Sequence, residues 1–173
     1  MIIKSLELSN FRNYENLNIT FDEGTNILFG DNAQGKTNIL ESIYLCATTK
    51  SHKGSKDKEI IRFGCDEGHI KAYINKDNIG QKIDMHLRSS KSKYIAVDGM
   101  KLKKASELLG LLKVVLFSPE DLSIIKNDPS ERRNFIDAEL CQIDSFYFYN
   151  LSQYKKIVEQ RNSLLKDSYY NPS

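Results

Sequence analysis

The sequence contains no tryptophan, only three prolines and only three cysteines. Cys46, Cys65 and Cys141 stand far apart, none at a metal-ligand spacing, and an odd number makes a poor disulfide framework. We therefore expect free thiols in a reducing compartment. No apolar run approaches the length of a membrane span, and the first residues lack the apolar stretch of a signal peptide. These absences predict a cytoplasmic protein with no membrane association.

An excess of charge of one sign is missing as well. The 25 basic and 23 acidic residues leave a formal net charge of +2, so bulk charge does not indicate nucleic-acid binding. Any contact with DNA must come from local clusters. The 173 residues, 40% of them hydrophobic, suffice for one substantial domain or for a domain and the beginning of a second.

The strongest motif is a glycine-rich loop. It matches the Walker A pattern, in which two glycines four residues apart flank the loop and Lys and Thr follow. Glycines let the backbone curl so that successive N–H groups point at a phosphate. Lys36 reaches the β- and γ-phosphates, and the hydroxyl of Thr37 is a ligand for Mg²⁺. The pattern predicts ATP and Mg²⁺ at Gly30, Asp31, Asn32, Ala33, Gln34, Gly35, Lys36 and Thr37.

The segments around this loop have clear periodicities. Apolar residues alternate with polar ones at 6–8 and 17–21, which predicts two strands joined by a turn at 13–16. The apolar run 25–29 does not alternate, and this is typical of a strand covered on both faces. A helix is expected at about 37–49.

That helix has one predicted apolar face. Ile39, Leu40, Ile43, Tyr44 and Ala47 fall at helical spacing and are expected to pack on the core. Glu41 and Ser42 are expected to face away from it.

The middle of the chain predicts an antiparallel meander. Apolar residues alternate at 70–74 and 83–87, and Asp98-Gly99 is a strong hairpin signal. Further on, 114–117 indicates another buried strand, and 118–121 has the residues that start a short helix.

Helices dominate the last part. One is expected from Asp128 through Leu140, and a long one over about 145–166 that presents an apolar stripe. The fold class is therefore α/β or mixed α+β: a P-loop lobe over residues 1–143 with a mixed sheet and a meander, then the start of a truncated helical arm over 144–173.

Several segments together resemble RecF, the bacterial recombination-repair ATPase related to SMC proteins and ABC-type ATPases. The similar segments occur in the family's order along essentially the whole chain, and no isolated motif could produce such a match. The segments are Leu6 to Tyr14, the loop with Thr37-Asn38-Ile39-Leu40-Glu41, Ser51-His52-Lys53, Phe117 to Leu122, Arg132 to Asp137, and Gln160 to Lys166.

This resemblance implies the first lobe of an ABC/SMC-like head. It implies ATP-dependent binding to single-stranded or gapped DNA and to single-strand/double-strand junctions. RecR and RecO would be partners in loading RecA during repair, and ATP held between two heads would make a homodimer. It also places Arg12, Asn13 and Asn38 beside the nucleotide.

Family elements are missing too. No Leu-Ser-x-Gly signature and no Walker B strand ending in paired acids is visible, so no catalytic residue is assigned. Family members are longer, and the chain is expected to be an N-terminal fragment that holds ATP with little or no hydrolysis. Lys53 replaces the family's arginine, which keeps the charge and loses the fork geometry.

Weaker candidates leave alternatives open. Lys50, Lys53, Lys56 and Lys58 either contact DNA phosphates or form a solvated loop. Arg132 and Arg133 either pair with nearby acids or bind an anion. His52, His69 and His86 are far apart in sequence, and a metal site is not expected.

Two other functions compete with the ATP-binding repair protein. One is a P-loop kinase or GTPase-type enzyme, although the meander does not resemble the repeated strand-helix units of such domains. The other is a non-hydrolysing interaction module whose phosphate loop is vestigial. Measurable nucleotide affinity distinguishes the ATP-binding protein from this module.

Overall fold

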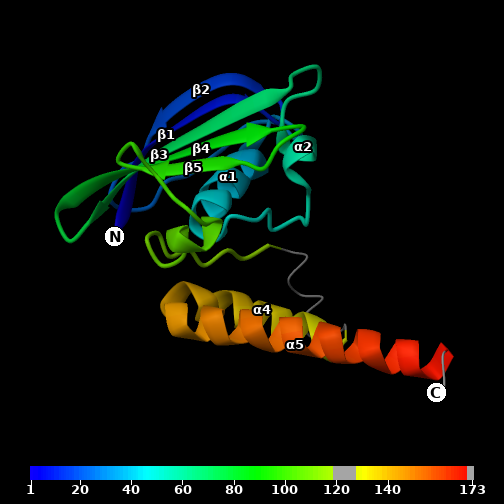
Figure 1. Ribbon diagram of the computed structural model, residues 1–173. Coiled ribbons are helices and arrows are strands. Elements are labelled where there is room, and N and C mark those ends of the chain that lie inside the picture. The colour runs from blue at the N-terminus through cyan, green and yellow to red at the C-terminus, as the bar shows by residue number, and fades with distance from the viewer. Residues whose placement is uncertain (119–127, 171–173) are drawn as a thin grey trace. The chain divides into compact units, whose positions relative to one another are not determined.

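The computed structural model describes residues 1–118 and 128–170 (Figure 1). Contacts between residues divide the chain into two compact units, Met1–Leu116 and Phe117–Ser173. The boundary suggested by the sequence, between residues 143 and 144, instead falls between two helices that pack against each other.

The first unit is built on a six-stranded sheet with the order β2-β1-β3-β4-β5-β6, in which every pair is antiparallel. The predicted meander is confirmed as β3, β4 and β5, and the α+β class is confirmed. The expected mixed sheet is not found, because no parallel pair of strands occurs within the described residues. The strands are β1 (Ile2–Phe11), β2 (Tyr14–Thr20), β3 (Glu67–Lys76), β4 (Ile79–Arg88), β5 (Tyr94–Val97) and β6 (Met100–Lys101).

The core lies on one face of this sheet, where helix α1 (Lys36–Thr48) covers it (Figure 1). Alternate residues of β3 and β4 point into this core because side chains of a strand alternate between faces. They are Ile70, Ala72, Ile74, Ile83, Met85 and Leu87, each at most 2% exposed. Fully burying one such aliphatic side chain contributes about 1.5–3 kcal/mol.

The opposite face of the sheet is polar. His69 and Lys71 of β3 lie half-buried on it, and with Glu7, Ser9 and Asn16 of β1 and β2 they line a shallow groove. Two short elements, α2 (Asp57–Ile60) and the 3-10 helix η1 (Ala105–Leu108), add Ile60 and Leu108 to the core.

Two predicted buried strands are wrong. Residues 25–29 and 114–117 form no strand, and several of their apolar side chains face solvent, with Phe29 91% and Val115 84% exposed. Leu28 and Val114 pack against the core. The physical reason is that no partner strand for either segment exists within the described residues, so the apolar runs lack the pairing that burial on both faces requires.

The buried face of α1 also differs from the prediction. Glu41 and Ser42, expected to point outward, are fully buried, whereas Leu40 is 43% exposed. The face in contact with the core passes through Ser42, Leu45 and Cys46. A helix rotated in this way buries a carboxylate, which requires partners described below.

The second unit is a pair of helices, α4 (Pro129–Ile143) and α5 (Ser145–Tyr170). The predicted start of α4 is confirmed, with Asp128 as N-cap and Pro129 in the first turn. The short helix predicted at 118–121 lies almost wholly outside the described residues. Arg132 and Arg133 are exposed near the start of α4.

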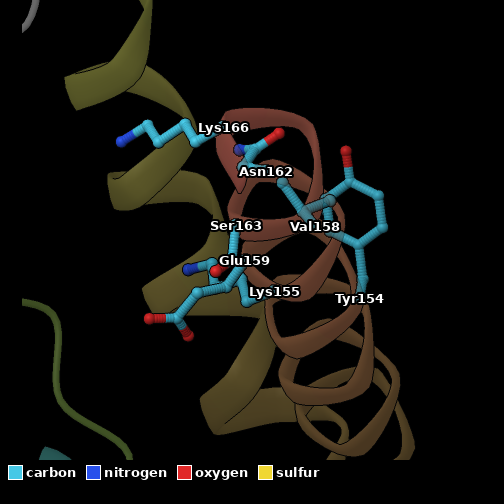
Figure 2. A pocket seen from close by; sticks show the side chains of 7 residues that line it. All are labelled: Tyr154, Lys155, Val158, Glu159, Asn162, Ser163 and Lys166. Carbon is cyan, nitrogen blue, oxygen red and sulfur yellow. The ribbon is translucent and has the colours of Figure 1, made fainter. Parts of the chain in front are cut away.

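Contacts from Asp137 join the two helices. Its carboxylate accepts a hydrogen bond from Tyr147 Oη at 2.6 Å and lies 3.5 Å from Lys155 Nζ. Figure 2 shows a shallow hollow on α5, lined by residues from Tyr154 to Lys166. Over the described residues, no helix has both the length and the apolar composition needed to cross a bilayer.

Candidate nucleotide-binding site

The glycine-rich loop leads directly into α1. Gly30, Ala33 and Gly35 have positive φ angles of 142°, 64° and 98°, so the backbone reverses direction repeatedly within six residues. Gly35 is the N-cap of α1 and makes no side-chain capping hydrogen bond. The first N–H groups of a helix have no partner within the helix, and together with the helix dipole they attract an anion.

The Lys36 side chain folds back over this loop. Its Nζ donates to the carbonyl oxygens of Gly30, at 2.8 Å, and Asp31, at 2.6 Å. The ammonium group therefore sits at the inner side of the curled backbone. Thr37 follows Lys36, exposed in the first turn of α1.

The turn between β1 and β2 braces the loop. Asn13 Nδ2 and Tyr14 Oη both donate to the Gln34 carbonyl, at 3.1 and 3.2 Å. Asn38 Nδ2 donates to Asn13 Oδ1 at 2.9 Å, so the turn, the loop and α1 are linked. Burial raises the pKa of Tyr14, which keeps its hydroxyl protonated as a donor.

Glycine is required at position 35 for two reasons. Its φ of 98° belongs to the left-handed region, and a Cβ there would lie 2.6 Å from Asn13 Oδ1 and 2.8 Å from Tyr14 Oη. Tyr14 was not singled out as a site residue from the sequence. The signal was present, because it closes the Phe11-Arg12-Asn13-Tyr14 segment.

Arg12 binds Glu41 of α1. Its Nε and Nη2 donate to the two oxygens of the Glu41 carboxylate at 2.9 and 2.6 Å. The guanidinium also donates to the Glu59 carbonyl at 2.9 Å and to Ser55 Oγ at 2.8 Å. The family resemblance implies that Arg12 lies beside the nucleotide; in the structure its donors converge on Glu41 and on the segment that follows α1.

Glu41 is the centre of a buried polar network. Besides Arg12, Ser51 Oγ donates to Glu41 Oε1 at 2.5 Å, and Lys53 Nζ lies 3.9 Å from Oε2. Burial by itself would raise the pKa of this carboxyl group. The hydrogen bonds and charges of Arg12, Ser51 and Lys53 outweigh burial, and the pKa of Glu41 is lowered. The carboxylate therefore stays ionised inside the core, which is tolerated because it is paired.

The four lysines proposed as DNA contacts are all exposed. Lys53 is turned toward Asn38, whose Oδ1 lies 3.4 Å from its Nζ, and toward Glu41. Lys56 caps α2, where its backbone N–H donates to Glu59 Oε2 at 2.9 Å, and Lys58 lies within that helix. Lys50 follows α1 directly.

The histidines are arranged differently from what their sequence separation suggested. His69 and His86 are direct partners in the β3–β4 ladder, and their rings stack with centroids 4.0 Å apart. His52 instead contacts Tyr44 edge to face. Distance along the sequence, the reason for expecting no metal site, therefore does not separate His69 from His86 in space, because the hairpin register brings them together.

Comparisons with known proteins bear on the family and the fold of this chain. A family model described as an AAA domain matches residues 5–169. The chain is 62% identical, over its whole length, to "DNA replication and repair protein RecF" of Lachnoclostridium phytofermentans. It is 39% identical to a solved structure of "the recombination mediator protein RecF-ATPrS in RecFOR pathway", which covers 99% of this chain with a TM-score of 0.94.

The RecF matches cover nearly all of this chain but only part of each relative. The chain spans about half the length of the curated relatives it matches, namely 48% of the Lachnoclostridium protein, and 47% of the solved RecF chain. An SMC ATPase structure with 24% identity covers 79% of the chain at a TM-score of 0.64. That likeness supports the ABC/SMC-like head fold.

Proposed function

The chain belongs to the AAA domain family and corresponds to the N-terminal ATPase part of RecF proteins, and on that premise we propose that it binds ATP through the loop from Gly30 to Thr37. The observation that carries the proposal is the loop itself, which places the Lys36 ammonium group inside a curled backbone at the N-terminus of α1. The match to a solved structure of RecF-ATPrS supports it.

Mg²⁺ is proposed to bind with the nucleotide. Thr37 stands in the first turn of α1, directly after Lys36, and its hydroxyl would be the protein ligand of the cation that accompanies the phosphates. Asn13 and Asn38 support the loop by bonding to Gln34 and to each other. Arg12 is proposed to position α1 through Glu41.

The wider role proposed is that of the ATP-binding part of a cytoplasmic DNA repair protein. Relatives carry the name DNA replication and repair protein RecF, and the solved relative is placed in the RecFOR pathway. Following the resemblance, we propose single-stranded or gapped DNA as the ligand, RecR, RecO and RecA as partners, and an ATP-dependent homodimer as the working form. Lys50, Lys53, Lys56 and Lys58 are proposed to contact DNA phosphates, because they are exposed near the nucleotide loop's helix.

Hydrolysis by this chain alone is proposed to be absent or very weak. Phosphoryl transfer needs a second metal ligand and a residue that positions water, beyond the loop that holds the phosphates. The sequence shows no strand ending in paired acids to supply them.

The test is titration calorimetry of the chain with Mg²⁺-ATP, with phosphate release followed in the same samples. Lys36→Ala should weaken ATP binding tenfold or more, because it removes the positive charge that contacts the β- and γ-phosphates. Lys91→Ala, an exposed lysine between β4 and β5, is the control and should bind as the unchanged chain does.

Each outcome has a clear meaning. Binding that depends on Lys36, with no phosphate released, supports an ATP-holding lobe. Repeated turnover means that the water-activating residue lies in this chain. No measurable binding favours an interaction module with a vestigial loop.

A further inference from the structure

On the polar face of the sheet, we propose that Glu67, His69 and His86 form a binding site for a divalent transition metal, with Zn²⁺ the best match. Glu67 and His69 stand two residues apart on β3 and so point to the same face. His86 lies directly opposite His69 on β4. Nothing in the nucleotide site uses these three residues, so the proposal is independent of ATP binding.

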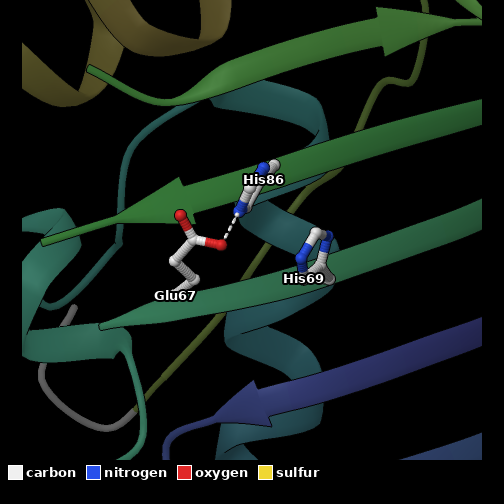
Figure 3. Close-up of side chains that lie close together, drawn as sticks. All are labelled: Glu67, His69 and His86. Carbon is white, nitrogen blue, oxygen red and sulfur yellow. Dashed lines mark hydrogen bonds and ion pairs between the residues drawn. The ribbon is translucent and has the colours of Figure 1, made fainter. Parts of the chain in front are cut away.

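The side chains converge at one point (Figure 3). His86 Nε2 lies 3.0 Å from Glu67 Oε2, and the two imidazole rings are stacked with an interplanar angle of 17°. One ligand atom from each of the three residues lies within 4.8 Å of the others. Two histidines and a carboxylate are therefore already gathered on one surface.

The backbone beneath this cluster is rigid. β3 and β4 pair continuously from Glu67 with Arg88 to Lys76 with Ile79, and the inward side chains on both sides of His69 and His86 are buried. Donors about 2.1 Å from a tetrahedral Zn²⁺ lie about 3.4 Å apart, so the ligand atoms, now within 4.8 Å of one another, must move closer. The two stacked rings must also turn out of parallel, so that both nitrogen lone pairs point at the ion.

The chemistry of the donors selects the metal. Neutral imidazole suits Zn²⁺ and its neighbours in the first transition row, and a carboxylate supplies one negative charge. A histidine binds a metal through an uncharged ring nitrogen. Three protein ligands leave one position for water.

The thiols are weak competitors for the same ion. Burial raises the pKa of Cys46 to about 12, and Cys141 is buried as well. Cys65 is partly exposed and is the remaining thiol that a metal could reach. The experiment must therefore distinguish the histidine cluster from Cys65.

The experiment titrates ZnCl₂ into the 173-residue chain in a buffer that does not bind metal, and follows heat together with the NMR signals of the histidine rings. Binding at one site should move the ring signals of His69 and His86 and leave that of His52 in place. His69→Gln and His86→Gln should each weaken binding about tenfold or more, and Glu67→Gln by about tenfold. Melting temperatures of the variants without metal establish that they fold.

A matched control is Glu7→Gln, which removes another carboxylate from the same face and should bind Zn²⁺ as before. The proposal is overturned if the ring signals of His69 and His86 do not move at millimolar Zn²⁺. It is also overturned if a variant that carries both His69→Gln and His86→Gln binds Zn²⁺ with unchanged affinity. Loss of Zn²⁺ binding in Cys65→Ser would overturn it as well.

Discussion

Arg12 and Glu41 form a two-point contact, in which Nε and Nη2 of the guanidinium meet the two carboxylate oxygens at 2.9 and 2.6 Å. Arg12 belongs to the turn that braces the phosphate loop, and Glu41 lies on the buried face of the helix that follows the loop. The pair therefore joins both supports of the loop. A bidentate geometry of this kind fixes orientation as well as distance.

Removing Arg12 should be strongly destabilising. Arg12→Gln leaves the Glu41 carboxylate buried with a weaker partner, and breaking a buried pair in this way costs about 3–5 kcal/mol. Chemical denaturation measures the change. Arg62→Gln is the matched control, because Arg62 pairs with exposed Glu15 at 3.4 Å. Its effect should stay below about 1 kcal/mol. Equal losses for the two variants would show that Glu41 does not depend on Arg12.

Acid should weaken the fold through Glu41. The pKa of this carboxyl group is lowered from 4.5, so the folded state favours the ionised form. Its contribution to stability is fully present above pH 4.5 and is lost as the pH falls through the lower pKa of the folded state. Unfolding free energies of the unchanged chain and of Glu41→Gln, measured from pH 7 to pH 3, should converge as the pH falls. A constant difference over this range would contradict the assignment.

Alanine at position 35 should disturb the loop more than alanine at another left-handed glycine. A Cβ at Gly35 would lie 2.6 Å from Asn13, whereas nothing lies within 4 Å of one at Gly99, which also has a positive φ. Gly99→Ala should cost only backbone strain of about 1 kcal/mol. Gly35→Ala should cost more and also displace Asn13 and Tyr14 from Gln34.

Calorimetry with Mg²⁺-ATP separates these two glycines. We expect Gly35→Ala to weaken ATP binding about tenfold or more, since backbone approach to the phosphates is lost. Gly99→Ala should bind with unchanged affinity. If both variants bind equally well, the close packing of Gly35 has no bearing on the nucleotide.

The sequence predicts the parts of this molecule that are encoded locally. The phosphate loop, the meander and the start of α4 each depend on a few neighbouring residues, such as Gly35 or Pro129, and the structure has them where they were expected. The family resemblance was confirmed by the comparisons because it rested on many segments in order.

Contacts between residues far apart in the sequence were not predicted. Glu41 was assigned to the exposed face from the helical spacing of its apolar neighbours. Its burial is explained by partners distant in sequence, above all Arg12, 29 residues away, together with Ser51. His69 and His86 meet because of the hairpin register, which periodicity alone does not fix. In the same way, an apolar run such as 25–29 indicates that the segment favours burial, but it does not show whether a partner strand is present to bury it.

The correction at residues 25–29 can itself be tested with two phenylalanines. Phe29 is 91% exposed, whereas Phe11, the last residue of β1, is fully buried in the core. Phe29→Ala should change the free energy of unfolding by less than about 0.5 kcal/mol, because an exposed side chain loses few contacts. Phe11→Ala should lower it by about 3–5 kcal/mol through lost burial and a cavity. Urea denaturation of this chain gives both values. A loss above about 2 kcal/mol for Phe29→Ala would mean that the segment is packed in solution as the buried strand that the sequence predicts.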